Sequence, residues 1–140
     1  MSKVEEKALW FIREFKVKRC PVDVQSIAEK QGWNILPYDS AAHIINDMGL
    51  QKYISLHPSV AIIYDATKYI LYDAKTSPEN RQNLIAHELG HYYIDYEGSD
   101  KIMSETQAER DAEQAEQDAD QFMRFVRAPL AYLSTQDRCV

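Results

Sequence analysis

Apolar and polar positions in the first part of the chain follow helical spacing. Between residues 3 and 15 the apolar side chains recur every three or four positions, which predicts an amphipathic helix that ends before Pro21. A second helix is expected to begin after Pro21, with Asp23 as a candidate cap, and to end at Gly32. Residues 33–38 then alternate in the manner of a short β-strand.

The middle of the chain contains two strand-like segments. Residues 60–64 and 69–72 are rich in β-branched and aromatic side chains, and residues 65–68 separate them. This arrangement predicts an antiparallel hairpin. Residues 40–48, which precede the hairpin, are interpreted as a short helix that ends at Gly49.

Two longer helices are predicted in the second half. Ser77 is suited to cap a helix, a proline follows it at the first helical position, and the apolar spacing carries this helix to about Tyr96. The last helix is expected over residues 104–126. The hydrophilic segment 97–107 is a candidate mobile loop.

The organisation of these elements predicts one domain that spans residues 1–140. No internal repeat and no linker rich in proline, glycine or serine interrupts the sequence. The expected fold class is α+β, with a small antiparallel sheet packed against the helix over 77–96 and the C-terminal helix.

The composition is that of a globular domain with an acidic balance. The 140 residues are 45% hydrophobic and carry a net charge of −6 at pH 7. This charge argues against nucleic acid as the main partner, because phosphate backbones are bound through basic patches. Basic residues dominate 3–19 and acidic residues dominate 95–120. That asymmetry indicates two differently charged solvated faces or, alternatively, a basic face that docks a partner.

The sequence also predicts a cytoplasmic location. Cys20 and Cys139, at opposite ends of the chain, form no disulfide framework and suit a reducing compartment. The N-terminus lacks the apolar core of a signal peptide, and no apolar run is long enough to span a membrane.

A metal-binding motif occupies the helix over 77–96. The segment from His87 to His91 is an H-E-x-x-H pattern. Residues four apart share one face of a helix, so the two imidazoles can reach one Zn²⁺. Glu88 flanks the first histidine and can take a proton from water that the zinc activates. The pattern therefore predicts His87 and His91 as zinc ligands and Glu88 as the catalytic base.

A catalytic zinc needs a third protein ligand, and the final helix offers one. The Gly-x-x-His continuation of longer zinc motifs is absent after His91. Glu116 falls inside the apolar stripe of the final helix, where a lone carboxylate is costly unless it is paired or bound to metal. Asp120, one turn later, can accept a hydrogen bond from the far nitrogen of His87. The alternative is that both carboxylates merely border an acidic face.

The segment 73–129 resembles the ImmA/IrrE family of metallopeptidases, small proteins often encoded by phages and mobile elements. The resemblance is carried by the segments 77–81 (Ser-Pro-Glu-Asn-Arg), 85–92 (Ile-Ala-His-Glu-Leu-Gly-His-Tyr) and 116–122 (Glu-Gln-Asp-Ala-Asp-Gln-Phe), closed by Ala128-Pro129. The chain departs from the family pattern at Met123, where alanine is usual, and in its approach to the closing proline.

The resemblance implies a zinc-dependent endopeptidase. In that case Glu116 is the third zinc ligand and Asp120 supports His87. The implied substrate is a helix-turn-helix repressor encoded nearby, bound in extended form along an exposed strand edge of the sheet. Nine tyrosines leave the group that stabilises the oxyanion unassigned.

Two alternative functions remain open from the sequence. Residues 22–32 are similar to the first helix and turn of a helix-turn-helix, which would make the chain a DNA-binding regulator, although a β-like segment follows them. The second alternative is a catalytically silent, zinc-containing interaction module. Glu88 argues against it, because a purely structural zinc site needs no base beside its ligand.

Overall fold

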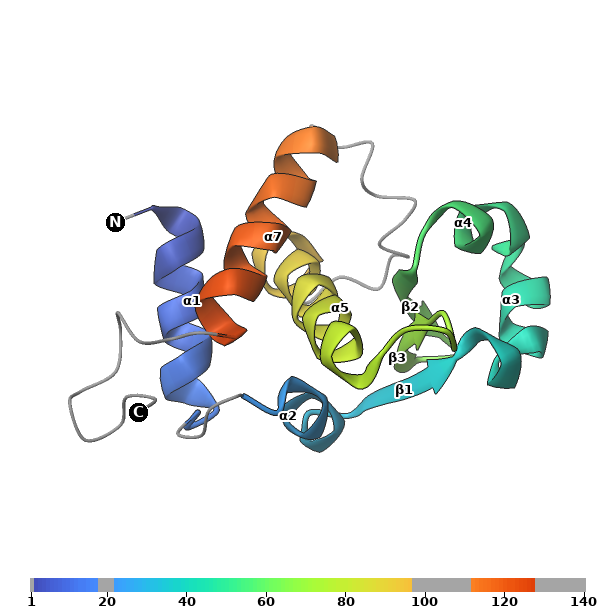
Figure 1. The fold of residues 1–140 in the computed structure, drawn as a ribbon, viewed down its shortest axis with the longest axis horizontal. Coiled ribbons are helices and arrows are strands. Elements are labelled where there is room, and N and C mark those ends of the chain that lie inside the picture. The colour runs from blue at the N-terminus through green and yellow to red at the C-terminus, as the bar shows by residue number, and fades with distance from the viewer. Residues whose placement is uncertain (1, 18–21, 97–111, 128–140) are drawn as a thin grey trace.

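The β-sheet lies between two groups of helices in the computed structural model, which describes residues 2–17, 22–96 and 112–127 (Figure 1). One core cluster joins α1 (Lys3–Glu14), α2 (Val24–Lys30), α5 (Pro78–His91) and α7 (Ala112–Arg127) to one face of the sheet. A second cluster joins the opposite face to α3 (Ala42–Met48) and to α4 (Gln51–Leu56). The α+β class predicted from the sequence is confirmed.

The sheet has three strands in the order β1-β3-β2, namely β1 (Trp33–Pro37), β2 (Ser59–Tyr64) and β3 (Thr67–Tyr72). As predicted, β2 and β3 form an antiparallel hairpin. The expectation of a wholly antiparallel sheet is wrong for the other pair, because β1 runs parallel to β3 with Ile35 opposite Ile70. Parallel pairing needs a long connection, and the three short helices and the strand between β1 and β3 supply it.

The hairpin turn is tighter than the sequence suggested. Asp65 and Ala66 both have positive φ, 50° and 60°, and Tyr64 pairs directly with Thr67. Two such residues form the turn whose twist matches that of the flanking strands.

Side chains alternate between the two faces of the hairpin. Val60 and Leu71 are paired and pack toward α3, whereas Ala61 and Ile70 are paired and pack toward α5. All four are buried. The sheet is therefore covered on both faces, and its apolar area is removed from water on each side.

The helix starts follow the capping chemistry expected from the sequence. The side chain of Asp23 accepts a hydrogen bond from the amide of Ser26, and that of Ser77 accepts one from the amide of Asn80. Gly49 ends α3 in the left-handed conformation, with φ of 66°. The short helix α4 was not predicted, and it begins without a side-chain cap. A 3₁₀ turn, η1 (Tyr38–Ser40), links β1 to α3.

Of the predictions about the C-terminal half, the helix over 77–96 lies within the described residues, the last helix only in part, and the candidate loop not at all. The predicted helix over 77–96 is present as α5 followed by the π-helical turn η2 (Tyr92–Tyr96). The predicted last helix is present as α7, while residues 104–111 and the candidate loop 97–107 lie outside the description.

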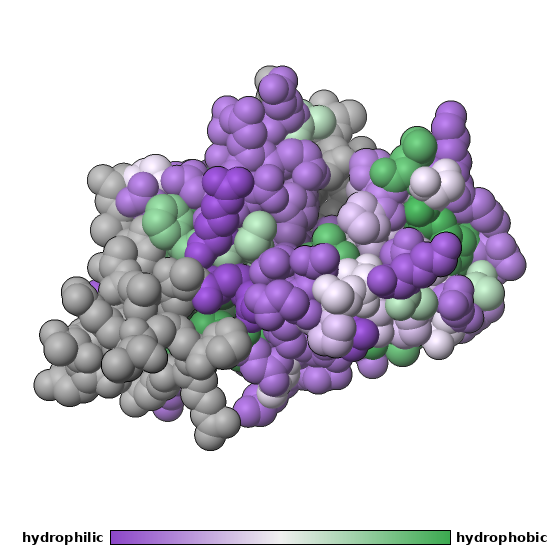
Figure 2. Space-filling model, in the orientation of Figure 1, coloured by the Kyte–Doolittle hydropathy of each residue, from purple (hydrophilic) through white to green (hydrophobic). Residues whose placement is uncertain are grey.

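The helix α7 packs across α5 and α1. One of its faces is apolar and the other is hydrophilic. Its inward stripe is buried and consists of Ala115, Ala119, Phe122 and Val126. Figure 2 shows mostly hydrophilic residues over its outward face. This division is the amphipathic pattern from which the helix was predicted.

None of the helices in the described part of the chain is both long enough and apolar enough to cross a bilayer.

Candidate metal centre

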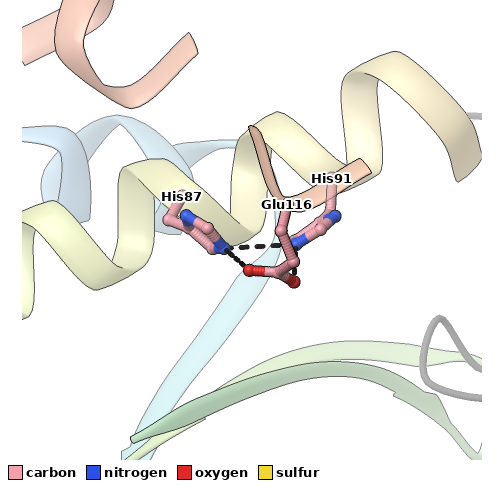
Figure 3. Close-up of side chains that lie close together, drawn as sticks. All are labelled: His87, His91 and Glu116. Carbon is pink, nitrogen blue, oxygen red and sulfur yellow. Dashed lines mark hydrogen bonds and ion pairs between the residues drawn. The ribbon is translucent and has the colours of Figure 1, made fainter. Parts of the chain in front are cut away.

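The helix α5 presents two imidazoles on one face. His87 and His91 lie one turn apart, and their Nε2 atoms are 3.2 Å from each other (Figure 3). The side chain of His91 is almost fully buried and that of His87 is slightly exposed.

Glu116 reaches these imidazoles from α7. Its Oε2 lies 3.0 Å from Nε2 of His87, and its Oε1 lies 2.8 Å from Nε2 of His91 (Figure 3). Each carboxylate oxygen thus faces one ring. Glu116 is half exposed despite its place beside the apolar stripe, so its carboxylate lies at the open side of the cluster.

Gly90 permits the close approach of the two helices. A Cβ atom at this position would lie 3.1 Å from the Cα of Ala119 and 3.1 Å from the Cβ of Phe122. A larger residue would require Ala119 or Phe122 on α7 to shift by a few tenths of an ångström. The glycine inside the H-E-x-x-H segment therefore permits the close contact of α5 with the helix that carries Glu116.

The three donors fit a small divalent metal ion. They are two imidazole nitrogens and a carboxylate, and the potential ligand atoms all lie within 4.8 Å of one another. Ligands held at 2.0–2.1 Å from a tetrahedral ion are about 3.3 Å apart. The separations of 2.8–3.2 Å among the Nε2 and Oε atoms are close to that spacing. This donor set is also the His, His, Glu combination that leaves a fourth position open at catalytic zinc sites.

The electrostatics of the cluster favour a positive charge beside Glu116. Burial by itself would lower the pKa of His87, but the hydrogen bond to Glu116 and the charge of Glu88 outweigh it and raise the pKa to about 9. The hydrogen bonds from His87 and His91 in turn hold the pKa of the Glu116 carboxyl far below its usual range. A cation at this position is therefore stabilised, and a metal ion must compete with a proton for it.

Asp120 lies where the sequence analysis placed it. Its Oδ1 is 2.9 Å from Nδ1 of His87, so it can accept the proton on that nitrogen and orient the ring. Nδ1 of His91 is buried, and within the described residues it has no comparable partner.

Glu88 is hydrogen-bonded to the first residue of β2, whereas Glu116 contacts the two imidazoles. Glu88 is only 7% exposed, and its Oε2 accepts a hydrogen bond of 2.8 Å from the hydroxyl of Ser59. A buried carboxylate without such a partner would be costly. Glu88 also lines a pocket of about 230 Å³ together with His87 and Glu116.

The opposite wall of this pocket was not anticipated from the sequence. It includes Tyr53 of α4, His57 just after this helix, and Ser59 at the start of β2. The ring of His57 stacks on that of Tyr53 with centroids 4.1 Å apart, and the hydroxyl of Tyr38 donates to the His57 carbonyl. No local pattern marks these residues, because α4 is short and uncapped and the wall forms only when β2 lies beside α5.

The structure also tests the alternative that residues 22–32 begin a helix-turn-helix. A helix-turn-helix requires a second helix directly after the turn. In this chain α2 is followed by β1, which begins one residue after Gly32. The helix-turn-helix interpretation of residues 22–32 is therefore wrong.

Comparison with known proteins identified one family. The model of Peptidase_M78, the IrrE N-terminal-like domain, matches residues 29–134, a span that contains β1 to β3, α5 and α7. Searches of curated proteins and of solved structures found no match.

Proposed function

The chain belongs to the Peptidase_M78 family of ImmA/IrrE metallopeptidases, and from this premise we propose that it is a zinc-dependent endopeptidase that cleaves a helix-turn-helix repressor. The convergence of His87, His91 and Glu116 carries the proposal, together with the pocket that His87 and Glu116 line with Glu88. Two imidazoles and one carboxylate suit zinc better than magnesium or calcium, which prefer ligand sets made of oxygen alone.

Five side chains have roles in the proposed reaction. His87, His91 and Glu116 would hold the zinc ion, and Asp120 would keep the His87 ring oriented. Zinc, when bound, polarises a carbonyl and lowers the pKa of water. Glu88 accepts a proton from the attacking water and then donates it to the leaving nitrogen of the peptide.

The sheet supports an extended substrate. Within the described ranges β2 is an edge strand whose neighbour is β3, so its other edge can accept main-chain hydrogen bonds. The same strand begins at Ser59, which lines the pocket with Glu88. A peptide added to this edge would therefore pass close to the proposed base.

The competing function is that of a silent zinc module. A structural zinc has four protein ligands and needs no neighbouring base. Among the described residues three donors cluster, and Glu88 borders the same pocket without joining them. These features favour catalysis.

Cleavage assays with matched variants test the proposal. The zinc-loaded protein and its Glu88→Gln variant are each incubated with purified repressors encoded near this gene, and new N-termini are mapped by mass spectrometry. We expect a single cut by the wild type, loss of the cut on chelation, and a rate at least about a hundredfold lower for Glu88→Gln at equal zinc content. Equal cleavage by both proteins, or no cleavage of any neighbouring repressor, would contradict the proposal.

A further inference from the structure

The hydroxyl-bearing side chain of Ser59 is buried and contacts the carboxylate of Glu88. It is 4% exposed, and its Oγ donates to Oε2 of Glu88 over 2.8 Å, although the two residues are 29 positions apart. Hydrogen bonds from a neutral donor to a carboxylate are stronger than those between neutral groups. This contact therefore fixes the Glu88 side chain more firmly than packing alone.

The sheet holds Ser59 in position. It begins β2 and pairs with Tyr72 of β3 in the antiparallel ladder. Next to it, the carbonyl of Pro58 accepts a hydrogen bond of 2.9 Å from the amide of Asp73. The hydroxyl is thus carried by a rigid element that is distinct from the helix that bears Glu88.

The second carboxylate oxygen of Glu88 is left available. Among the described residues no hydrogen bond to Oε1 is recorded, and the Glu88 side chain lines the pocket beside His87 and Glu116. One oxygen is anchored to the sheet while the other is not engaged, which is the arrangement that a base with one working oxygen requires.

We propose that Ser59 is a positioning residue for Glu88. Its hydroxyl holds Oε2 so that Oε1 stays directed to the proton that must be moved. The inference rests on the proposed peptidase function. It adds that the orientation of the base depends on the same edge strand along which the substrate is expected to lie.

Kinetics of Ser59 variants test this role. Ser59→Ala removes the donor, Ser59→Thr keeps a hydroxyl, and Ser55→Ala removes an exposed hydroxyl of α4 that bonds the carbonyl of Lys52 instead. With fluorescein-labelled casein as the probe, we expect Ser59→Ala to lower kcat about ten- to a hundredfold. KM and zinc content should stay unchanged, Ser59→Thr should recover most of the loss, and Ser55→Ala should match the wild type. An unchanged kcat in Ser59→Ala, or a fall that follows loss of zinc, would overturn the inference.

A second measurement does not depend on activity or on zinc. The urea midpoints of the metal-free wild type, Ser59→Ala, Glu88→Ala and the double variant form a double-mutant cycle. We expect the double variant to lose less than the sum of the single losses, because each single change already breaks the same contact. Additive midpoints would overturn the inference. If the zinc-loaded wild type cleaves neither casein nor a repressor encoded nearby, that result counts against the peptidase proposal, and the cycle still decides whether Ser59 holds Glu88.

Discussion

Glu88 and Glu116 are carboxylates beside the same two imidazoles, yet their surroundings differ. Glu116 is half exposed and bonded to both rings, whereas Glu88 is buried and bonded to a serine hydroxyl. A group that contacts both potential ligands suits metal binding, and a group held apart from them suits proton transfer. The two roles therefore follow from environment rather than from residue type.

Removal of the Glu116 carboxylate should empty the proposed zinc site. We expect Glu116→Ala to lose most of its zinc, because two imidazoles on one helix bind the ion much more weakly than three ligands. Gln117→Ala, which alters the adjacent exposed residue of α7, is the control. Metal content of the purified proteins, measured by mass spectrometry, checks the prediction, and a full complement of zinc in Glu116→Ala would refute it.

Zinc affinity should rise with pH up to about 9. The pKa of His87 is raised to about 9 in the metal-free protein, so this imidazole is protonated at neutral pH and must lose its proton before it can bind metal. Below that pH, each unit of acidification should weaken binding by about tenfold for this one proton. Competition with a zinc chelator at pH 6, 7 and 8 measures the slope, and a constant affinity over this interval would contradict the prediction.

At the scale of elements, the site depends on the contact between α5 and α7. Gly90 and Ala119 allow the helix axes to approach, and Phe122 fills the space beside them. Arg127, at the end of α7, bonds to Asn83 and pairs with Glu79 on α5, which fixes the two helices at a second point. A ligand on each helix can meet only while this packing is maintained.

Substitution of Gly90 should therefore disturb both stability and metal binding. A methyl group here meets the backbone of Ala119 at 3.1 Å, and overpacking of this kind costs about 1–3 kcal/mol. The better helix propensity of alanine offsets about 1 kcal/mol of that loss. We expect Gly90→Ala to lower the free energy of unfolding and the zinc affinity together, as measured by urea titration and metal competition.

The control for Gly90→Ala is an exposed position of the same helix. Asn80→Ala improves helix propensity without introducing a close contact and should leave stability unchanged or slightly higher. A stability gain in Gly90→Ala comparable to that of Asn80→Ala would show that the interhelical distance is not set at Gly90.

At the scale of the whole molecule, a metal ion would link α5 and α7, which both contribute to one core cluster. Ligands that bind only the folded state stabilise it by mass action, by about 2.7 kcal/mol at a hundred times the dissociation constant. For a chain of this length that corresponds to a melting temperature about 8 °C higher. We expect this difference between zinc-loaded and chelated protein in scanning calorimetry, and its absence in Glu116→Ala.

The same calorimetry experiment tests the prediction that residues 1–140 form one domain. Because the sheet contributes to both core clusters, we expect a single cooperative transition with and without zinc. Two separate transitions would show that the clusters unfold independently.

The amino-acid sequence by itself determined the features that depend on near neighbours in the chain. Helical spacing placed His87 and His91 on one face, Ser77 and Asp23 marked helix starts, and two β-rich segments around a short turn predicted the hairpin. The helix starts and the hairpin follow from the sequence because capping and periodicity act over a few residues. The same periodicity singled out Glu116 as a carboxylate inside the apolar stripe of α7, whereas its side chain is 54% exposed in the structure and lies beside that stripe.

The tertiary structure alone decided which distant segments meet. The parallel pairing of β1 with β3, the approach of α7 at Gly90, and the hydrogen bond from Ser59 to Glu88 join parts of the chain that no local pattern connects. The pocket wall that carries His57 likewise depends on an unpredicted helix. Such contacts are selected by the packing of the whole core, in which many weak interactions compete, so they become visible only when the chain is folded.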